Sequence, residues 1–107
     1  MRDYNIDEAR DILKSQDPAE LNLIPHVEKR WLERDININY AVDCLLHKIP
    51  LSISKTTYNR FKIIYPHETK PTQDLYVIIE ISENRNVSIY TVYSADKKRR
   101  EYERKPR

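Results

Sequence analysis

Histidine and arginine side chains recur at four-residue steps within PHVEKRWLERDI, residues 25–36. On a helix, His26, Arg30 and Arg34 would follow one another on or beside the polar side, because one turn takes about 3.6 residues. Histidine exchanges a proton near neutral pH, and arginine neutralises the charge of a phosphate. Metal-independent cleavage of RNA needs an acid, a base and cations around the phosphorane. The residue types in this stretch suit that chemistry.

The start of this predicted helix also matters for the chemistry. If Pro25 opens the helix, His26 lies in the first turn, where the positive end of the helix dipole favours a neutral imidazole and attracts phosphate. The alternative is an ordinary solvated face, on which Glu28 and Glu33 pair with neighbouring basic residues. The spacing alone favours this solvent-facing interpretation.

Other site chemistries find little support in the sequence. The three histidines, His26, His47 and His67, have no carboxylate or cysteine at a ligand spacing, so we expect no metal site. Cys44 lies among apolar residues and is interpreted as a buried structural thiol. The chain contains no glycine, which excludes the P-loop and the dinucleotide fingerprint. We therefore expect no cofactor.

Length and composition indicate one folded domain. The chain has 107 residues, a single cysteine and no apolar signal core at its start, and its apolar run around YVII is too short to span a bilayer. We expect a cytoplasmic protein with no membrane partner. The charge is uneven, because residues 96–107 contain seven Lys or Arg against three acids. We predict a domain over residues 1–95 and a basic, flexible tail over 96–107, which would either bind a polyanion or be solvated.

Helix signals fill the first half of the chain. Asn5 followed by Glu8 has the pattern of a capping box, and the helix after it should end near Ser15. A short turn is expected at 19–23, followed by the helix over 25–36. Asn37 looks like the cap of a further, largely buried helix that breaks at Pro50.

Strand signals follow, rich in β-branched and aromatic residues at 58–65, 75–82 and 87–94, with a possible extension at 51–54. The run 75–82 is apolar on both faces and should be central. Arg60 and Lys62 should leave the core together, most simply from a charged edge strand. Tyr90 and Tyr93 should point to opposite faces. We predict an α+β fold in which N-terminal helices precede a three- to four-stranded antiparallel β-meander and lie on one face of the sheet.

Several of these patterns occur together in a known group of proteins. The arrangement H-x3-R-x3-R-x-I, here His26 to Ile36, is followed by a polar cap, a short helix and a meander ending in VSIYTVY with a basic run after it. It resembles a family of small prokaryotic domains of unknown function that are similar to the RelE and BrnT toxins, the ribonucleases of toxin–antitoxin modules. The match covers residues from about His26 to Arg100. The family often has glycine where this chain has Asp35 and Lys48 or Ile49.

The resemblance implies a cleft between helix and sheet that binds or cleaves RNA, and a cognate antitoxin protein as a partner. His26, Arg30 and Tyr93 would be the catalytic residues. The basic residues Lys97, Lys98, Arg99 and Arg100 would bind the substrate, and from residue type and position we add Arg34 as a phosphate ligand and Lys62 as a cleft residue. Two alternatives stay open, namely a non-catalytic interaction module, which could form a homodimer through its sheet, and a nucleic-acid binder that uses only its basic tail.

Overall fold

The computed structural model describes residues 3–16, 22–23 and 37–104, with 22–23 and 101–104 described by their backbone alone. The predicted helix over 25–36 lies outside these residues. The described elements, in chain order, are α1 (Ile6–Ser15), β1 (Asn22–Leu23), α3 (Ile38–His47), β2 (Ser52–Thr57), β3 (Arg60–Pro66), β4 (Gln73–Ile81), β5 (Val87–Asp96) and α4 (Lys97–Arg104). None of the described helices is long and apolar enough to cross a membrane.

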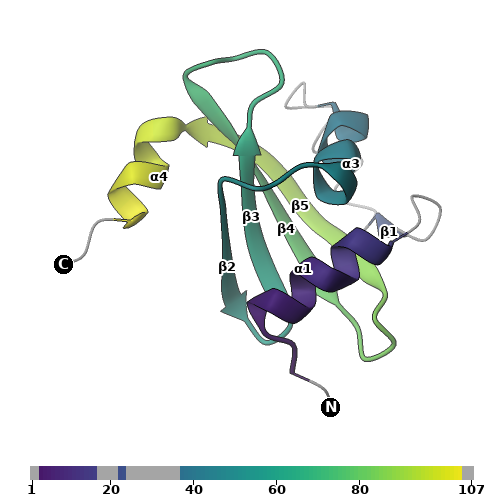
Figure 1. The fold of residues 1–107 in the computed structure, drawn as a ribbon. Coiled ribbons are helices and arrows are strands. Elements are labelled where there is room, and N and C mark those ends of the chain that lie inside the picture. The colour runs from purple at the N-terminus through teal and green to yellow at the C-terminus, as the bar shows by residue number, and fades with distance from the viewer. Residues whose placement is uncertain (1–2, 17–21, 24–36, 105–107) are drawn as a thin grey trace.

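The strands form one sheet in the order β1-β5-β4-β3-β2 (Figure 1). Strands β2 to β5 are an antiparallel meander, and β1, a strand of two residues within the predicted turn at 19–23, pairs in parallel with β5. The α+β class and the central position of β4 are confirmed. The interpretation of Arg60 and Lys62 as edge residues is wrong, because the extension at 51–54 forms β2 and makes β3 an interior strand.

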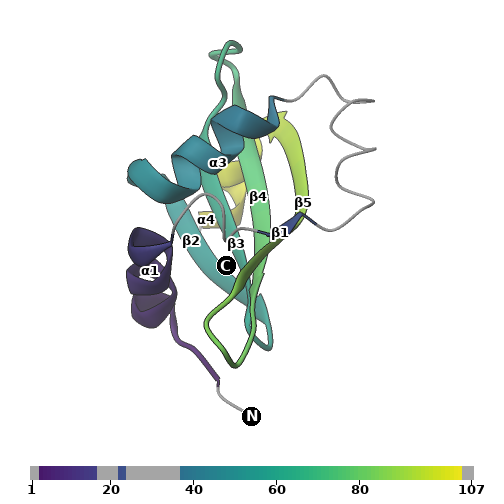
Figure 2. The same cartoon turned by 90° about the vertical axis from the view of Figure 1, so that its right-hand side faces the viewer.

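Helices α1 and α3 lie on the same side of the sheet (Figures 1 and 2). Helix α1 begins where predicted, with a capping box in which Glu8 N donates to Asn5 Oδ1 at 2.8 Å and Asn5 N donates to Glu8 Oε1 at 3.2 Å. Both helices contribute apolar residues to one buried cluster with alternate residues of β3, β4 and β5. Its largest side chains include Tyr4, Ile12, Phe61, Tyr65, Leu75, Ile79 and Ile89.

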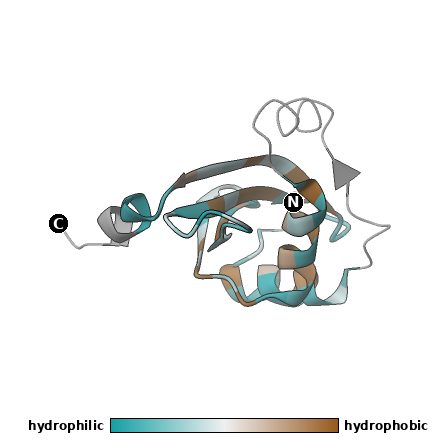
Figure 3. Cartoon of the chain, turned by 90° about the horizontal axis from the view of Figure 1, so that it is seen from above, coloured by the Kyte–Doolittle hydropathy of each residue, from teal (hydrophilic) through white to brown (hydrophobic). Residues whose placement is uncertain are grey.

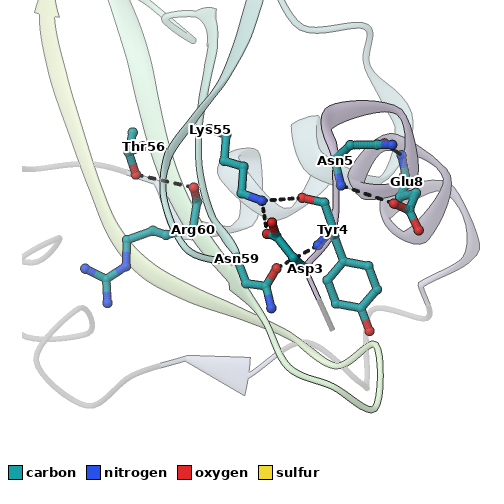
Figure 4. A network of polar contacts seen from close by, with 8 residues as sticks. All are labelled: Asp3, Tyr4, Asn5, Glu8, Lys55, Thr56, Asn59 and Arg60. Atoms are coloured by element: carbon teal, nitrogen blue, oxygen red, sulfur yellow. Dashed lines mark hydrogen bonds and ion pairs between the residues drawn. The ribbon is translucent and has the colours of Figure 1, made fainter. Parts of the chain in front are cut away.

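The segment before α1 is fixed to the β2–β3 and β4–β5 hairpins by polar contacts, and Figure 4 shows those made with Lys55 and Asn59. Tyr4 N donates to Asn59 Oδ1 at 2.9 Å, and the fully buried Tyr4 donates its hydroxyl to the carbonyl groups of Ser82 and Glu83. Lys55 Nζ donates to Tyr4 O at 2.7 Å and forms an ion pair with Asp3. The N–H and C=O groups of Tyr4 both gain a partner here, which avoids a large desolvation penalty.

Two hairpin turns require a positive φ although the chain has no glycine. Asn59, between β2 and β3, has φ 56°, as expected for the residue type that best tolerates this region after glycine. Arg85, between β4 and β5, has φ 65°. An arginine there lacks the local side-chain hydrogen bonding that helps asparagine, so this position carries some strain.

The basic segment is helical where the sequence predicted a flexible tail after residue 95. Strand β5 continues through Asp96, and α4 follows at once, strongly hydrophilic and at one end of the sheet (Figure 3). Lys98 N donates to Asp96 Oδ1 at 2.9 Å, and Lys97 N donates to Thr72 O at 3.0 Å. Arg100 Nε donates to Asp74 Oδ2 at 2.8 Å. These contacts join the start of the helix to the rest of the domain.

Candidate nucleic-acid interface

The face of the sheet turned away from α1 and α3 has a different composition from the core face. Alternation in β3 places Phe61 and Ile63 in the core and therefore turns Arg60 and Lys62 to the other side. Residues directly opposite one another on neighbouring strands share a face, so the pairings of Lys62 with Ile78 and of Tyr76 with Tyr93 extend this surface across the sheet. Figure 4 shows Arg60 extending away from Lys55 and Tyr4.

Strand β5 brings a second tyrosine to this surface through an irregularity. The register between β4 and β5 shifts between Ile78, opposite Thr91, and Ile79, opposite Ile89, which leaves Tyr90 as an extra residue. The Arg60 guanidinium lies 3.9 Å from the centre of the Tyr90 ring. Tyr90 and Tyr93 therefore share a face, and the prediction that they point to opposite faces is wrong because strict alternation fails at the bulge.

We call this surface the basic–aromatic face and define it by six residues: Arg60, Lys62, Tyr76, Tyr90, Tyr93 and Arg99. The rings of Tyr76 and Tyr93 stack with centroids 5.0 Å apart and an interplanar angle of 23°. Lys62 Nζ lies 5.8 Å from the Tyr76 ring, and the Arg99 guanidinium, from α4, lies 5.6 Å from the same ring and 6.0 Å from that of Tyr93. Cations and rings thus alternate across four elements.

Charge and exposure vary across the face. Arg60 pairs with the Glu80 carboxylate at 3.1 Å. Tyr76 is fully buried, whereas Tyr90 and Tyr93 are partly exposed and Arg99 is exposed. The buried Tyr76 ring packs against the Tyr93 ring, and Tyr90, Tyr93 and Arg99 lie at the surface, where a ligand could contact them. Aromatic rings beside cations suit the bases and phosphates of a single-stranded nucleic acid.

The structure brings together some of the residues predicted from sequence. Lys62, Tyr93 and Arg99 lie on the basic–aromatic face, and Lys97 and Lys98 are exposed at the start of α4. Arg100 is instead held by Asp74, whose side chain is only 4% exposed, so its described contact is structural. The remaining predicted residues, His26, Arg30 and Arg34, lie outside the described residues, and their roles stay predictions.

Three residues of the face were absent from the predicted site. Arg60 was recognised as leaving the core but was assigned to an edge strand, and Tyr76 was recognised only as part of the central strand. Tyr90 was placed on the wrong face relative to Tyr93. The alternation of β3 was a usable signal for Arg60, because Lys62 belongs to the same face of the same strand. No local signal identifies the bulge at Tyr90.

The other chemically reactive side chains have structural surroundings. Cys44 is fully buried, and burial raises the pKa of its thiol, so the expected inert thiol is found. His67 Nδ1 accepts the N–H groups of Thr69 and Lys70, both at 3.1 Å, and so closes the turn between β3 and β4. The described residues contain no cluster of His, Cys, Asp and Glu able to hold a metal ion.

Comparison of the chain with protein-family models, with curated proteins and with solved structures gave no match. The resemblance to RelE and BrnT toxins therefore rests on the sequence patterns alone, and the basic–aromatic face rests on the geometry.

Proposed function

We propose that this protein binds single-stranded RNA on its basic–aromatic face and belongs with the RelE-like toxins that act as metal-independent endoribonucleases. The observation that carries the binding part is the alternation of Arg60, Lys62 and Arg99 with Tyr90, Tyr76 and Tyr93 across one face. The cleavage part is supported by the resemblance and by the residue types of the stretch at 25–36.

The contacts within the face suggest how RNA would bind. A guanidinium stacked on a tyrosine presents its N–H groups sideways, toward a phosphate, while its own flat surface remains available to a base. Tyr90 and Tyr93, three residues apart on β5, would contact successive unstacked bases, and Lys62, on β3, would contact a phosphate. Duplex RNA would fit poorly, because its bases are already stacked on one another.

The cleavage part assigns roles to residues in two regions. His26 would be the acid or base, with Arg30 and Arg34 as phosphate ligands, and the Tyr93 hydroxyl would contact the scissile phosphate from the sheet. This arrangement requires His26 to approach Tyr93 when RNA is bound, since proton transfer needs hydrogen-bond reach.

Binding is tested by fluorescence anisotropy with a labelled single-stranded RNA, using Tyr93→Ala and Tyr58→Ala. Tyr58 is a matched control, because it is 48% exposed and lies in the β2–β3 turn, outside the face. Loss of one stacked base should weaken binding by about tenfold or more in Tyr93→Ala, since such stacking is worth about 1–3 kcal/mol. Equal affinity of both variants and the parent would reject the face as the RNA site.

Cleavage is tested separately by incubating the protein with total RNA in excess EDTA, beside His26→Ala. Cleavage by the parent alone supports a metal-independent nuclease that uses His26. RNA that is bound but left intact reduces the proposal to an RNA-binding protein. If binding instead disappears only when residues 96–107 are deleted, the basic-tail alternative is correct, and a stable homodimer with no RNA affinity would favour the interaction module.

A further inference from the structure

The side of the molecule that carries the helices contains a hollow that the RNA proposal does not use. It lies between α1, the end of α3 and the start of β2, with a volume of about 310 Å³, and its floor is formed by Leu13, Leu45, Ile53 and Ile63. We call it the helix-side groove. Its volume is at the lower end for sites that enclose a ligand, which begin near about 300 Å³, so it has room for a few side chains.

The rim of the helix-side groove is basic. Arg10 and Lys14 stand one turn apart on α1, and Lys48 follows the last residue of α3 on the opposite side. No carboxylate is present among the described lining residues. Within the described part of the chain, neither Arg10 nor Lys14 is held in an ion pair. The groove therefore presents an apolar floor between cations.

A large apolar side chain stands exposed at the same place. Ile49 lines the groove and is 91% exposed, the most of any large hydrophobic residue described. It lies in the segment that joins α3 to β2, which Figure 1 shows crossing from the helices to the edge of the sheet. Burial of an exposed isoleucine side chain against another apolar surface is favourable, because it removes apolar area from water, so Ile49 would contribute to a contact made here.

We propose that the helix-side groove binds an amphipathic helix of a partner protein, one that presents aliphatic side chains flanked by carboxylates. The apolar floor and Ile49 select the aliphatic side chains, and the cations of both walls select the flanking charge. Helices bind apolar grooves through side chains at i, i+3 or i+4. Such a pair of side chains would fit the short apolar floor of the helix-side groove. Complementary charge around the rim fixes orientation and accelerates association.

The test uses two labelled synthetic peptides with the same leucine pairs at helical spacing. In one peptide all remaining positions are glutamate, and in the other they are lysine. Anisotropy should show binding of the glutamate peptide only. Lys14→Glu combined with Lys48→Glu should weaken it by about tenfold, since two exposed charge pairs together are worth about that much. Ile49→Asp should remove it. Lys70→Glu, an exposed charge reversal in the β3–β4 turn, is the matched control and should bind as the parent does.

Equal binding of both peptides, or glutamate-peptide binding that survives Ile49→Asp, would overturn the proposal. Sedimentation measures the oligomeric state of the parent and of Ile49→Asp. A dimer formed by the parent but not by the variant would show that a second copy of this chain occupies the groove instead. The helix-side groove and the basic–aromatic face are on opposite sides of the sheet, so RNA affinity should stay unchanged in Ile49→Asp. Failure here is thereby distinguished from failure of the proposed function.

Discussion

At the scale of single residues, Asn59 has two separate structural roles. Its backbone adopts a positive φ of 56°, and its side chain accepts the N–H of Tyr4, the residue that anchors the N-terminal segment. The side chain is only 5% exposed, so water cannot replace it as an acceptor. Substitutions can separate the two roles, because glycine adopts the conformation without supplying the acceptor.

We predict that Asn59→Gly lowers the free energy of unfolding by about 1–3 kcal/mol, the usual cost of leaving a buried N–H without a partner. Asn59→Ala should cost about 1 kcal/mol more, because a Cβ disfavours positive φ. Urea denaturation of the parent and both variants measures the order. Equal stability of the glycine and alanine variants would show that a Cβ at this positive φ does not lower the free energy of unfolding.

Two tyrosine hydroxyl groups, that of the fully buried Tyr65 and that of the partly buried Tyr40, predict a loss of stability at alkaline pH. Partial burial, assisted by a hydrogen bond with Cys44, raises the pKa of Tyr40 from its usual 10 to about 12. Burial also raises the pKa of Tyr65. Above pH 10 the unfolded chain therefore releases protons that the folded chain retains. Stability contributed by these groups is complete below pH 10 and is lost as the pH rises toward about 12.

The measurement is the urea midpoint at intervals from pH 9 upward. Tyr65→Phe should flatten the decline, since phenylalanine has no proton to release, whatever its effect on stability at neutral pH. Tyr40→Phe should flatten it too, and should also lower stability at pH 7, because the Tyr40 hydroxyl donates to Pro66 O at 2.7 Å. An unchanged slope in both variants would assign the alkaline loss to other groups.

At the scale of elements, α4 is joined to the sheet through a partly buried ion pair. Arg100 Nε lies 2.8 Å from Asp74 Oδ2, and the side chains are 19% and 4% exposed. Removing the arginine leaves the carboxylate of β4 buried without its cation. A charge left in this way destabilises a protein far more than the pair itself stabilises it.

We therefore expect Arg100→Gln to lower the free energy of unfolding by about 3 kcal/mol. Arg99→Gln, a neighbouring exposed arginine on the same helix, should cost less than about 1 kcal/mol. Adding Asp74→Asn to Arg100→Gln should recover part of the loss, because the uncompensated charge is then gone. Urea denaturation of the three variants measures these free energies of unfolding. Similar losses in Arg100→Gln and Arg99→Gln would contradict a stabilising role for the Arg100–Asp74 ion pair.

Local signals predicted the elements well where neighbouring residues determine the backbone. Asn5 with Glu8 marked the start of α1, Asn37 capped α3, and Pro50 followed its end closely. The features that were missed depend on partners distant in sequence. The two-residue pairing of β1 with β5 and the bulge at Tyr90 follow from sheet register, and α4 ends up helical although its charged residues resemble a solvated tail.

The same distinction applies to the candidate site. Lys62 was selected by residue type and strand phase and Tyr93 by the resemblance, and they share a face because β3, β4 and β5 pair as neighbours in the antiparallel meander. The contribution of Tyr76 depends on its register opposite Tyr93. Pairing register is fixed by the whole buried face, so a single strand sequence does not contain it.

At the scale of the whole molecule, the two faces of the sheet have different chemistry. One face carries the core beneath α1 and α3, and the other carries the basic–aromatic face. A polyanion would approach the second face, since three cations are arranged there and α4 extends the basic surface at one end. Binding to RNA should accordingly depend on salt in proportion to the cations engaged.

We predict that the logarithm of the RNA association constant falls linearly with the logarithm of salt concentration, with a slope of about −2 if Arg60, Lys62 and Arg99 each contact a phosphate. Lys62→Gln should reduce the slope by about 0.7 for a single strand. Lys70→Gln, a change in an exposed loop, should leave the slope unchanged. A slope that is insensitive to Lys62→Gln would show that this lysine makes no phosphate contact.

The anchoring of Tyr4 has a consequence for the order in which the chain folds during synthesis. Residues 3–5 leave the ribosome before the sheet does, and the groups that hold Tyr4 lie 55 residues downstream at Asn59 and 79 downstream at Glu83. Until the β4–β5 turn has emerged, the Tyr4 hydroxyl lacks the two carbonyl groups that accept it, although α1 can already pack against α3 and β2. The N-terminal segment is thus fixed in its final position only late in synthesis, because contacts between residues distant in sequence form after both partners are present.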